Sequence, residues 1–242
     1  MKYIFLLAGK GSRLQPLTFS SPKALYQLDD STTLVQRMAG LLRKHDSGAD
    51  IIAVTGYMHE DVERCLPGVK FRYNPFYGVT NSVASLWFAR NELCCGSDVV
   101  LLNGDLVMSE ALVRDVICSE VKNPSVLLDS SVKHGGDYNV EVLGNQVLVM
   151  SKDLTDYYGE YAGVTRLDSR SAGMLAEEVS LMVEGGFYDQ WYENALVQMI
   201  FRGSFKLYFE DIAEYEWTEV DTVNDLLKAR QIHVMEKNAK CE

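Results

Sequence analysis

The sequence predicts an α/β protein with a Rossmann-like, mainly parallel mixed sheet, flanked by helices and completed by a small antiparallel lid. Two observations carry this prediction. Up to about residue 130, short apolar runs alternate with segments of helical periodicity, which is typical of strands joined by crossover helices. Beyond that point, paired short strands replace the alternation and indicate an antiparallel addition to the sheet.

Each element of the first part has a local signal. Tyr3–Leu7 is an apolar run that ends in glycines, and Val99–Leu102 is apolar throughout, as expected for a strand buried on both faces. Ser31 or Thr32 caps the first helix, and Pro67-Gly68 ends the second. The expected order is strand Tyr3–Leu7, helix Thr33–Lys44, strand Asp50–Thr55, helix Met58–Cys65, strand Val69–Tyr73, helix Ser82–Leu93, strand Val99–Leu102, helix Ser109–Val121 and strand Ser125–Leu128.

The second part begins with a hairpin. Gly144-Asn145 is a good two-residue turn, so the short strands on either side of it are expected to pair in antiparallel fashion. The expected order is strands Asn139–Leu143, Val147–Met150 and Tyr161–Leu167, helices Ser171–Val183 and Gln190–Phe201, strands Phe205–Phe209 and Trp217–Val220, and a closing helix Val223–Glu236.

The composition narrows the class of protein. The chain has 242 residues, of which 47% are hydrophobic, enough for one sizeable core. Its formal net charge of -11 argues against a nucleic-acid or anionic-membrane partner, because both require clustered cations. Five cysteines without a C-x-x-C pair favour reduced thiols in the cytoplasm, and no apolar run approaches the length of a membrane span.

The first strand leads into a glycine-rich turn followed by cations. Gly9 and Gly11 let backbone N–H groups approach a polyphosphate, and Arg13 and Lys23 bring positive charge to it. The pattern is neither a P-loop nor a complete dinucleotide fingerprint, because Leu14 occupies the position of the third glycine. A strand–helix turn without a ligand explains the glycines alone equally well.

Two carboxylates follow later strands. Asp105 comes after the apolar strand and the pair Asn103-Gly104, at the sheet edge where open α/β sheets bind ligands. Asp221 follows the strand Trp217–Val220 in the same way. Carboxylate oxygens suit Mg²⁺, whereas a turn or a helix cap is the structural alternative for each residue.

Together these strings resemble the signature of the sugar-nucleotidyltransferase-like family. The stretch L-A-G-x-G-S-R-L-x-P-L-T, followed by P-K, begins near the N-terminus, as that family's motif does. The resemblance implies a GT-A-like nucleotidyltransferase fold and a loop that wraps a nucleoside triphosphate. It implies nucleotide contacts for Leu7, Ala8, Gly9, Gly11, Ser12, Arg13, Lys23 and Gly104, catalytic roles for Lys23, Arg13 and Asp105, and Mg²⁺ ligation by Asp105 and Asp221.

The segment around residue 80 narrows the resemblance. N-P-x-Y-x-x-T-N-S-x-x-S-L-W is similar to the LicC-like branch, which comprises cytidylyltransferases of phosphocholine and aminoethylphosphonate. The resemblance implies that Asn81 and Ser82 hydrogen-bond the pyrimidine of CTP, although both residues also suit a helix cap. Lys152, in the place of the sugar enzymes' Glu-Lys-Pro, would hold the acceptor's phosphate.

Two further segments, Gly159–Gly163 and Trp191–Asn194, resemble the acceptor pocket of that branch. Glu160, with Tyr161 or Tyr192, is expected to face a substrate ammonium through charge pairing and cation–π contact. Ordinary core packing is the alternative for the aromatic residues. Because Trp191 and Tyr192 lie in one helical pattern, one of the two is expected in the core.

These observations predict one domain over residues 1–242, with a nucleotide-binding half at 1–130 and an acceptor-binding half at 131–242. The expected reaction couples CTP to phosphocholine, phosphoethanolamine or 2-aminoethylphosphonate and releases pyrophosphate. A sugar-1-phosphate nucleotidyltransferase using UTP or dTTP, and a non-catalytic nucleotide sensor, are the alternatives. The oligomeric state, including a homodimer, stays open.

Overall fold

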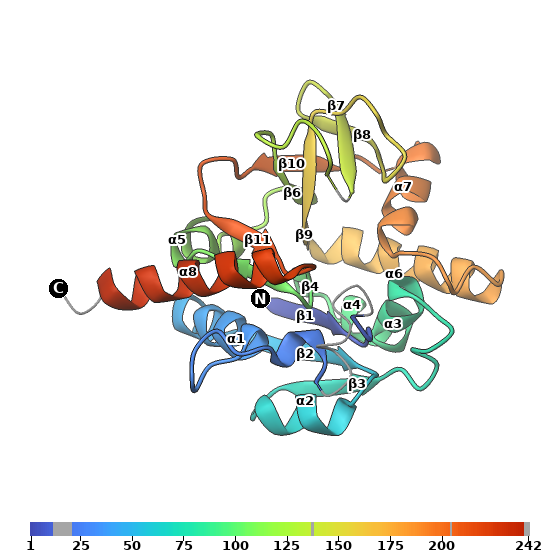
Figure 1. Ribbon diagram of the computed structural model, residues 1–242. Coiled ribbons are helices and arrows are strands. Elements are labelled where there is room, and N and C mark those ends of the chain that lie inside the picture. Colours follow the sequence, from blue (N-terminus) through green and yellow to red (C-terminus); the bar gives the residue numbers. More distant parts are fainter. Residues whose placement is uncertain (12–20, 137, 204, 240–242) are drawn as a thin grey trace.

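The computed structural model describes residues 1–11, 21–136, 138–203 and 205–239 of the chain (Figure 1). Its described strands form one nine-stranded sheet in the order β3-β2-β1-β4-β9-β6-β10-β8-β7 and a separate pair, β11-β5. The strands are β1 (Lys2–Leu7), β2 (Asp50–Thr55), β3 (Lys70–Tyr73), β4 (Val99–Asn103), β5 (Leu106–Met108), β6 (Ser125–Asp129), β7 (Asn139–Leu143), β8 (Gln146–Ser151), β9 (Gly159–Leu167), β10 (Tyr208–Asp211) and β11 (Trp217–Glu219).

Helices cover both faces of the sheet. In Figure 1, α1 and α2 lie on one side of the parallel strands, and α3, α4 and α6 lie on the other. The helices are α1 (Leu34–His45), α2 (His59–Cys65), α3 (Ser82–Phe88), α4 (Arg90–Leu93), α5 (Glu110–Leu112), α6 (Ser169–Glu184), α7 (Glu193–Phe201) and α8 (Val223–Ala239), with shorter turns η3 (Lys23–Leu25) and η4 (Val113–Ile117).

The parallel half of the sheet is buried on both faces. β1 runs parallel to β2 and β4, and β2 runs parallel to β3. Successive side chains of β1 point to opposite faces, so Tyr3 and Phe5 join the apolar cluster that contains Met38 of α1, whereas Ile4 joins the cluster that contains Leu86 of α3. This double burial explains the continuous apolar runs of these strands.

The other half of the sheet is mostly antiparallel. β9 lies between β4 and β6 and is antiparallel to both, which confirms a mixed sheet. The predicted hairpin forms as β7 and β8, with Gly144 in the left-handed region at φ 61°. The hairpin pairs with β9 and β10, so it continues the central sheet instead of standing apart as a lid.

Most helices differ from their expected ranges at one end or both. The helix expected at Ser82–Leu93 is broken at Ala89, whose φ of -102° and ψ of 7° leave the helical region and separate α3 from α4. The helix expected at Ser109–Val121 ends early, because α5 passes into the π-helical turn Val113–Ile117. The helix α7 starts at Glu193, three residues later than expected.

Further boundaries are shifted, among them the start of α1 and one strand. Thr33, one residue beyond the expected cap, caps α1 through a reciprocal capping box with Gln36. The strand expected at Phe205–Phe209 is displaced to Tyr208–Asp211, where it pairs with β6. Neither shift moves a predicted site residue.

A short strand that the sequence did not predict brings distant carboxylates together. β5 pairs antiparallel with β11, and Leu106 lies opposite Glu219. The N–H of Val220 donates to the carbonyl oxygen of Asp105 at 2.9 Å. Because Glu219 ends β11 and Asp221 lies two residues further on, this pairing sets acids from the two halves of the chain side by side.

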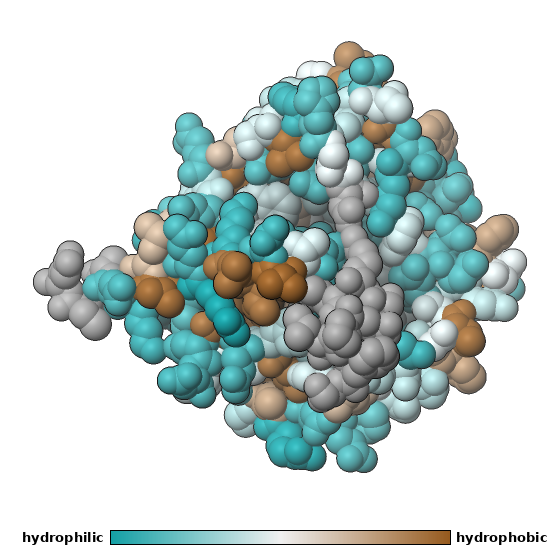
Figure 2. Space-filling model, in the orientation of Figure 1, coloured by the Kyte–Doolittle hydropathy of each residue, from teal (hydrophilic) through white to brown (hydrophobic). Residues whose placement is uncertain are grey.

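The surface in Figure 2 is largely hydrophilic, with an apolar patch along α8. The exposed apolar side chains of α8 are Val223, Leu227, Val234 and Met235. Exposed apolar residues of this kind are ordinary on globular proteins. Within the described part of the chain, no helix combines the length and the hydropathy that a membrane span needs.

Gly104 offers a test of how the carboxylate-bearing turn is held. A Cβ at this position would lie 2.5 Å from the carbonyl oxygen of Leu6 and 2.6 Å from Cδ2 of Leu7. We expect Gly104→Ala to lower the free energy of unfolding by about 1–3 kcal/mol, as overpacking does. Urea unfolding measures this. The matched Gly40→Ala in α1 meets no atom within 4 Å, so it should be neutral or stabilising.

Candidate active site

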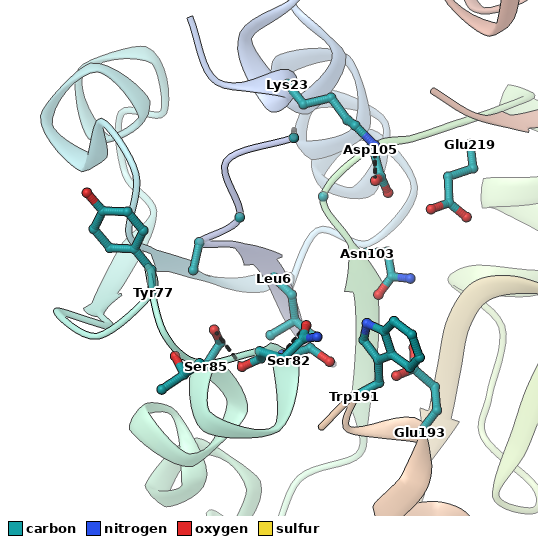
Figure 3. Close-up of a pocket in the computed structure, with 16 residues that line it drawn as sticks. Leu6, Lys23, Tyr77, Ser82, Ser85, Asn103, Asp105, Trp191, Glu193 and Glu219 are labelled. Carbon is teal, nitrogen blue, oxygen red and sulfur yellow. Dashed lines mark hydrogen bonds and ion pairs between the residues drawn. The ribbon is translucent and has the colours of Figure 1, made fainter. Parts of the chain in front are cut away.

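A cavity of about 300 Å³ opens at the carboxyl ends of β1 and β4 (Figure 3). In Figure 3, Lys23 and Asp105 lie at one end of this cavity, and Ser82, Trp191 and Glu193 lie at the other. The cavity therefore joins residues from both halves of the chain. The predicted site residues that line it are Ala8, Gly9, Gly11, Lys23, Asn81, Ser82, Gly104 and Asp105.

The glycine-rich turn forms one wall of the cavity. Gly9 and Gly11 line it directly, and Gly11 adopts a φ of 62°, which favours glycine. Leu7 is buried below this wall and borders a smaller cavity that shares Lys23. Ser12 and Arg13 lie outside the described residues.

Lys23 lies at the start of the short turn η3, where Pro22 precedes it with a φ of -65°. Its buried ammonium donates to Oδ2 of Asp105 at 2.8 Å and also to Oδ1 of Asp221. Burial favours the neutral amine, but the two carboxylates outweigh it and raise the pKa of Lys23 above 10.5. Lys23 is therefore charged at neutral pH.

Three carboxylates can hold a metal ion at this end of the cavity. Ligand atoms of Asp105, Glu219 and Asp221 all lie within 4.8 Å of one another. Oδ1 of Asp105 is buried and has no hydrogen-bond partner among the described residues, which leaves it available as a ligand. Three hard oxygen donors fit a divalent ion such as Mg²⁺. Glu219 was not predicted, although its spacing of two from Asp221 at a strand end places both on one side.

Asn81 and Ser82 line the cavity and also stabilise the start of α3. Oδ1 of Asn81 accepts from the N–H of Ser82 at 2.8 Å, which is the expected capping role. Oγ of Ser82 accepts from the N–H of Tyr192 at 2.9 Å. The amide group of Asn81 and the hydroxyl hydrogen of Ser82 are the donors that these bonds leave for a ligand.

Two of the predicted acceptor residues do not face the cavity. Tyr161 and Tyr192 are buried in the core, their hydroxyls lie 2.5 Å apart, and Thr165 hydrogen-bonds both. The prediction that they contact an acceptor is wrong for these two side chains, because an aromatic residue whose hydroxyl is satisfied internally packs in the core. Trp191 lines the cavity instead, so the expectation that one member of the pair is a core residue is confirmed.

The other two predicted acceptor residues, Lys152 and Glu160, lie in different places. Nζ of Lys152 lies 4.0 Å from the centre of the Trp191 ring, in a cation–π contact. Glu160 does not line this cavity. It lines a neighbouring groove, which meets the cavity at Glu219.

Glu193, the first residue of α7, is a second titratable group, besides Glu219, to which the sequence prediction assigned no role. Its carboxyl lines the cavity, and Oε2 is buried without a hydrogen-bond partner among the described residues. Burial raises the pKa of Glu193 to about 7, although Lys152 and a hydrogen bond from Asn103 oppose the shift. A buried acid beside an aromatic residue is suited to receive a cationic group.

Comparison with known proteins assigns the family. The sequence profile described as "Nucleotidyl transferase" matches residues 2–127, just over half of the chain. The chain belongs to the nucleotidyl transferase family. It is therefore an enzyme of the nucleotidyltransferase class, and members of this class generally use a divalent metal ion, a nucleoside triphosphate and a phosphorylated acceptor.

Individual proteins that are similar to this chain are also nucleotidyltransferases. The choline-phosphate cytidylyltransferase of Streptococcus pneumoniae (strain ATCC BAA-255 / R6) is 25% identical over 240 residues, which cover 96% of this chain and 98% of that protein. A solved structure of the CTP:phosphocholine cytidylyltransferase LicC from Streptococcus pneumoniae superposes with a TM-score of 0.73 at 23% identity, covering 96% of this chain and 98% of that one.

Two other solved structures share the fold. A Bacillus anthracis protein assigned as a glucose-1-phosphate thymidylyltransferase has a TM-score of 0.74 at 21% identity, with 96% of this chain and 94% of that chain covered. The inositol-1-phosphate CTP transferase from T. maritima has a TM-score of 0.72 at 18% identity, with 96% and 95% covered. These likenesses show the nucleotidyltransferase fold.

The raised pKa of Glu193 predicts a pH-dependent stability. The unfolded chain loses this proton near the usual value of 4.5, whereas the folded protein keeps it up to about 7. Stability relative to Glu193→Gln should therefore fall as the pH rises from about 4.5 to about 7, by about 2–4 kcal/mol, and then level off. Urea unfolding of both proteins at pH 5, 6, 7 and 8 measures the difference. A constant difference across this range would contradict the burial argument.

Lys23 bonds two members of the acidic cluster formed by Asp105, Glu219 and Asp221. These contacts predict how tightly divalent ions bind in the absence of substrates. Removing the ammonium in Lys23→Ala leaves Asp105, Glu219 and Asp221 without this counter-charge, so Mn²⁺ should bind on the order of tenfold more tightly. Asp221→Asn should weaken Mn²⁺ binding. Calorimetric titration of the three proteins measures both effects, and weaker binding in Lys23→Ala would contradict the charge argument.

Proposed function

We propose that this nucleotidyltransferase transfers a cytidylyl group from CTP to a small acceptor that carries a phosphate or phosphonate at one end and an amine or a quaternary ammonium at the other. Phosphocholine, phosphoethanolamine and 2-aminoethylphosphonate are acceptors of this kind. The relation to a choline-phosphate cytidylyltransferase over nearly the whole chain supports this choice. The proposed roles are a nucleotide-binding half at residues 1–130 and an acceptor-binding half at 131–242.

One observation carries the acceptor assignment. Trp191 and Glu193 line the same cavity as Lys23, and Lys152 lies over the Trp191 ring. A buried carboxylate next to an aromatic face suits an ammonium group, because it supplies both charge and a polarisable surface. The Lys152 ammonium, which occupies that aromatic face here, is free to pair with the acceptor's phosphate once the acceptor's amine takes its place.

The proposed chemistry is an in-line displacement. An ionised oxygen of the acceptor attacks the α-phosphorus of CTP, the bond to pyrophosphate breaks, and no general base is needed because the attacking oxygen carries no proton. Mg²⁺ held by Asp105, Glu219 and Asp221 would stabilise the negative charge on the α-phosphate. Gly9 and Gly11 offer backbone N–H groups to the triphosphate.

Lys23 has a distinct proposed role in this reaction. Its ammonium is already buried beside Asp105 and Asp221, so it needs little reorganisation to reach the phosphate under attack. Positive charge that is fixed in place before the reaction is the most effective kind of transition-state stabilisation. Asn81 and Ser82 are proposed to donate to the pyrimidine. The proposed setting is cytoplasmic, without a nucleic-acid or membrane partner.

The deciding experiment measures pyrophosphate release over a matrix of four nucleoside triphosphates and a set of acceptors. The acceptors are phosphocholine, phosphoethanolamine, 2-aminoethylphosphonate, inositol-1-phosphate and glucose-1-phosphate. We expect the highest kcat/KM for CTP with a phospho- or phosphono-amine. A preference for glucose-1-phosphate with UTP or dTTP would instead support the sugar-1-phosphate alternative. Nucleotide binding without turnover on any acceptor would support a sensor.

Loss of one carboxylate from the acidic cluster is expected to lower turnover strongly. Asp105→Asn should lower kcat on the order of 10²-fold or more, because the transition state loses both a metal ligand and the partner of Lys23. The fold should survive, since the amide has nearly the same shape. Asp115→Asn, which changes an exposed acid paired with Arg114, is the matched control. Steady-state kinetics with circular dichroism separates catalysis from folding.

The acceptor end of the cavity predicts a selective effect on substrates. Glu193→Gln should weaken amine-bearing acceptors by about 1.5–3 kcal/mol, the range for a hydrogen bond to a charged group, while leaving the KM for CTP unchanged. Glu160→Gln, in the neighbouring groove, is the control and should leave the same acceptors unaffected. The KM values of phosphoethanolamine and inositol-1-phosphate for each variant measure this. An effect of Glu160→Gln alone would return the role to Glu160.

A further inference from the structure

The connector between α6 and α7 is hydrogen-bonded to the start of α3. The N–H of Asn81 donates to the carbonyl of Tyr188 at 3.0 Å, and the N–H of Val83 donates to the carbonyl of Gln190 at 3.1 Å. In the opposite direction, the N–H of Tyr192 donates to Oγ of Ser82 at 2.9 Å. Helix-terminal N–H groups usually turn to a cap, water or a ligand. Here two of them are used to attach another segment.

This attachment joins two parts of the cavity. Ser82 belongs to the wall proposed for the nucleobase, whereas Trp191 and Glu193 belong to the wall proposed for the acceptor, and Figure 3 shows the three residues at the same end. Trp191 and Glu193 flank Tyr192, whose side chain is fixed in the core by its bond to Tyr161. The backbone N–H of Tyr192 is thus the point at which α3 can control both acceptor residues.

The Ser82 hydroxyl can still donate one hydrogen bond. It accepts from Tyr192, and among the described residues its own hydrogen finds no acceptor. A hydroxyl that accepts one hydrogen bond and donates another polarises both, so each bond strengthens the other. A carbonyl oxygen or ring nitrogen of a nucleobase is an acceptor of the right kind for this hydrogen.

We infer that Ser82 is a positioning residue that couples the two substrates: its hydroxyl donates to the nucleobase and thereby tightens its hold on the Tyr192 N–H. Bound nucleotide then fixes Trp191 and Glu193 in the arrangement that receives the acceptor. The inference rests on the proposed function for its acceptor, but the coupling itself requires only that a nucleotide binds. Such coupling must be reciprocal, so an acceptor also strengthens nucleotide binding.

The test follows the amide of Tyr192 by hydrogen exchange. Peptides that span residues 187–193 are compared with and without saturating CTP and Mg²⁺, and saturation is verified by calorimetry. In the wild-type protein we expect CTP to slow exchange of this amide about 5-fold or more, the lower range of typical coupling between sites. In Ser82→Ala the slowing should disappear, and Ser82→Thr, which keeps a hydroxyl, should restore it.

Ser85→Ala is the matched control. Ser85 also lines the cavity from α3, but its hydroxyl bonds Asn74 and the carbonyl of Asn81, not the connector. It should keep the CTP-dependent slowing. Equal slowing in Ser82→Ala and wild type, or no slowing in the wild type, would overturn the inference. Complete loss of CTP binding in Ser82→Ala would also count against it, because Ser82 would then be a nucleotide ligand without a relay.

A second readout separates this inference from the proposed function. The dissociation constant of phosphocholine is measured with and without a non-hydrolysable CTP analogue. If the wild type shows CTP-dependent exchange but binds no phosphocholine, the acceptor assignment fails and the relay stands. If it binds phosphocholine more tightly with the analogue, and Ser82→Ala keeps the same ratio, the relay fails and the proposed function stands.

Discussion

The pairing of β5 with β11 is the constraint on which the active site depends. It brings Asp105, from the first half of the chain, against Glu219 and Asp221, which lie more than a hundred residues later. Three carboxylates this close repel one another unless positive charge lies among them. Lys23 supplies that charge by bonding two of the three, and burial makes the attraction strong. The structure therefore holds the proposed catalytic cation and the proposed metal ligands together as one group.

At the other end of the cavity, three consecutive residues differ in which way they face. Trp191, Tyr192 and Glu193 are consecutive, yet the first and third line the cavity while the second is buried in the core. Tyr192 can be buried because Tyr161 and Thr165 satisfy its hydroxyl. Among the described residues, Oε2 of Glu193 has no equivalent hydrogen-bond partner, so this buried atom is available to a ligand. An unsatisfied buried acid costs stability, which is accepted most readily where a ligand restores the balance.

The two ends are joined by the sheet and by one loop. β1 and β4 bring the glycine-rich turn and Asp105 to the same edge of the sheet, because the carboxyl ends of parallel strands meet there. The connector before α7 is hydrogen-bonded to the start of α3, so the residues proposed for the base and for the acceptor share a common support. The cavity thus depends on contacts between segments far apart in the chain, and few of its walls are local.

The α/β class, the order of most strands and helices, and the motif-bearing residues Gly9, Gly11, Lys23, Asp105 and Asp221 could be predicted from the sequence. Periodicity, turn chemistry and motif spacing are local properties that a linear sequence displays. The tertiary contacts set which acids meet, which of two neighbouring aromatic residues faces the cavity, and that Oε2 of Glu193 is buried without a hydrogen-bond partner among the described residues. Those outcomes depend on the β5–β11 pairing and on packing against distant side chains, and neither leaves a local signal.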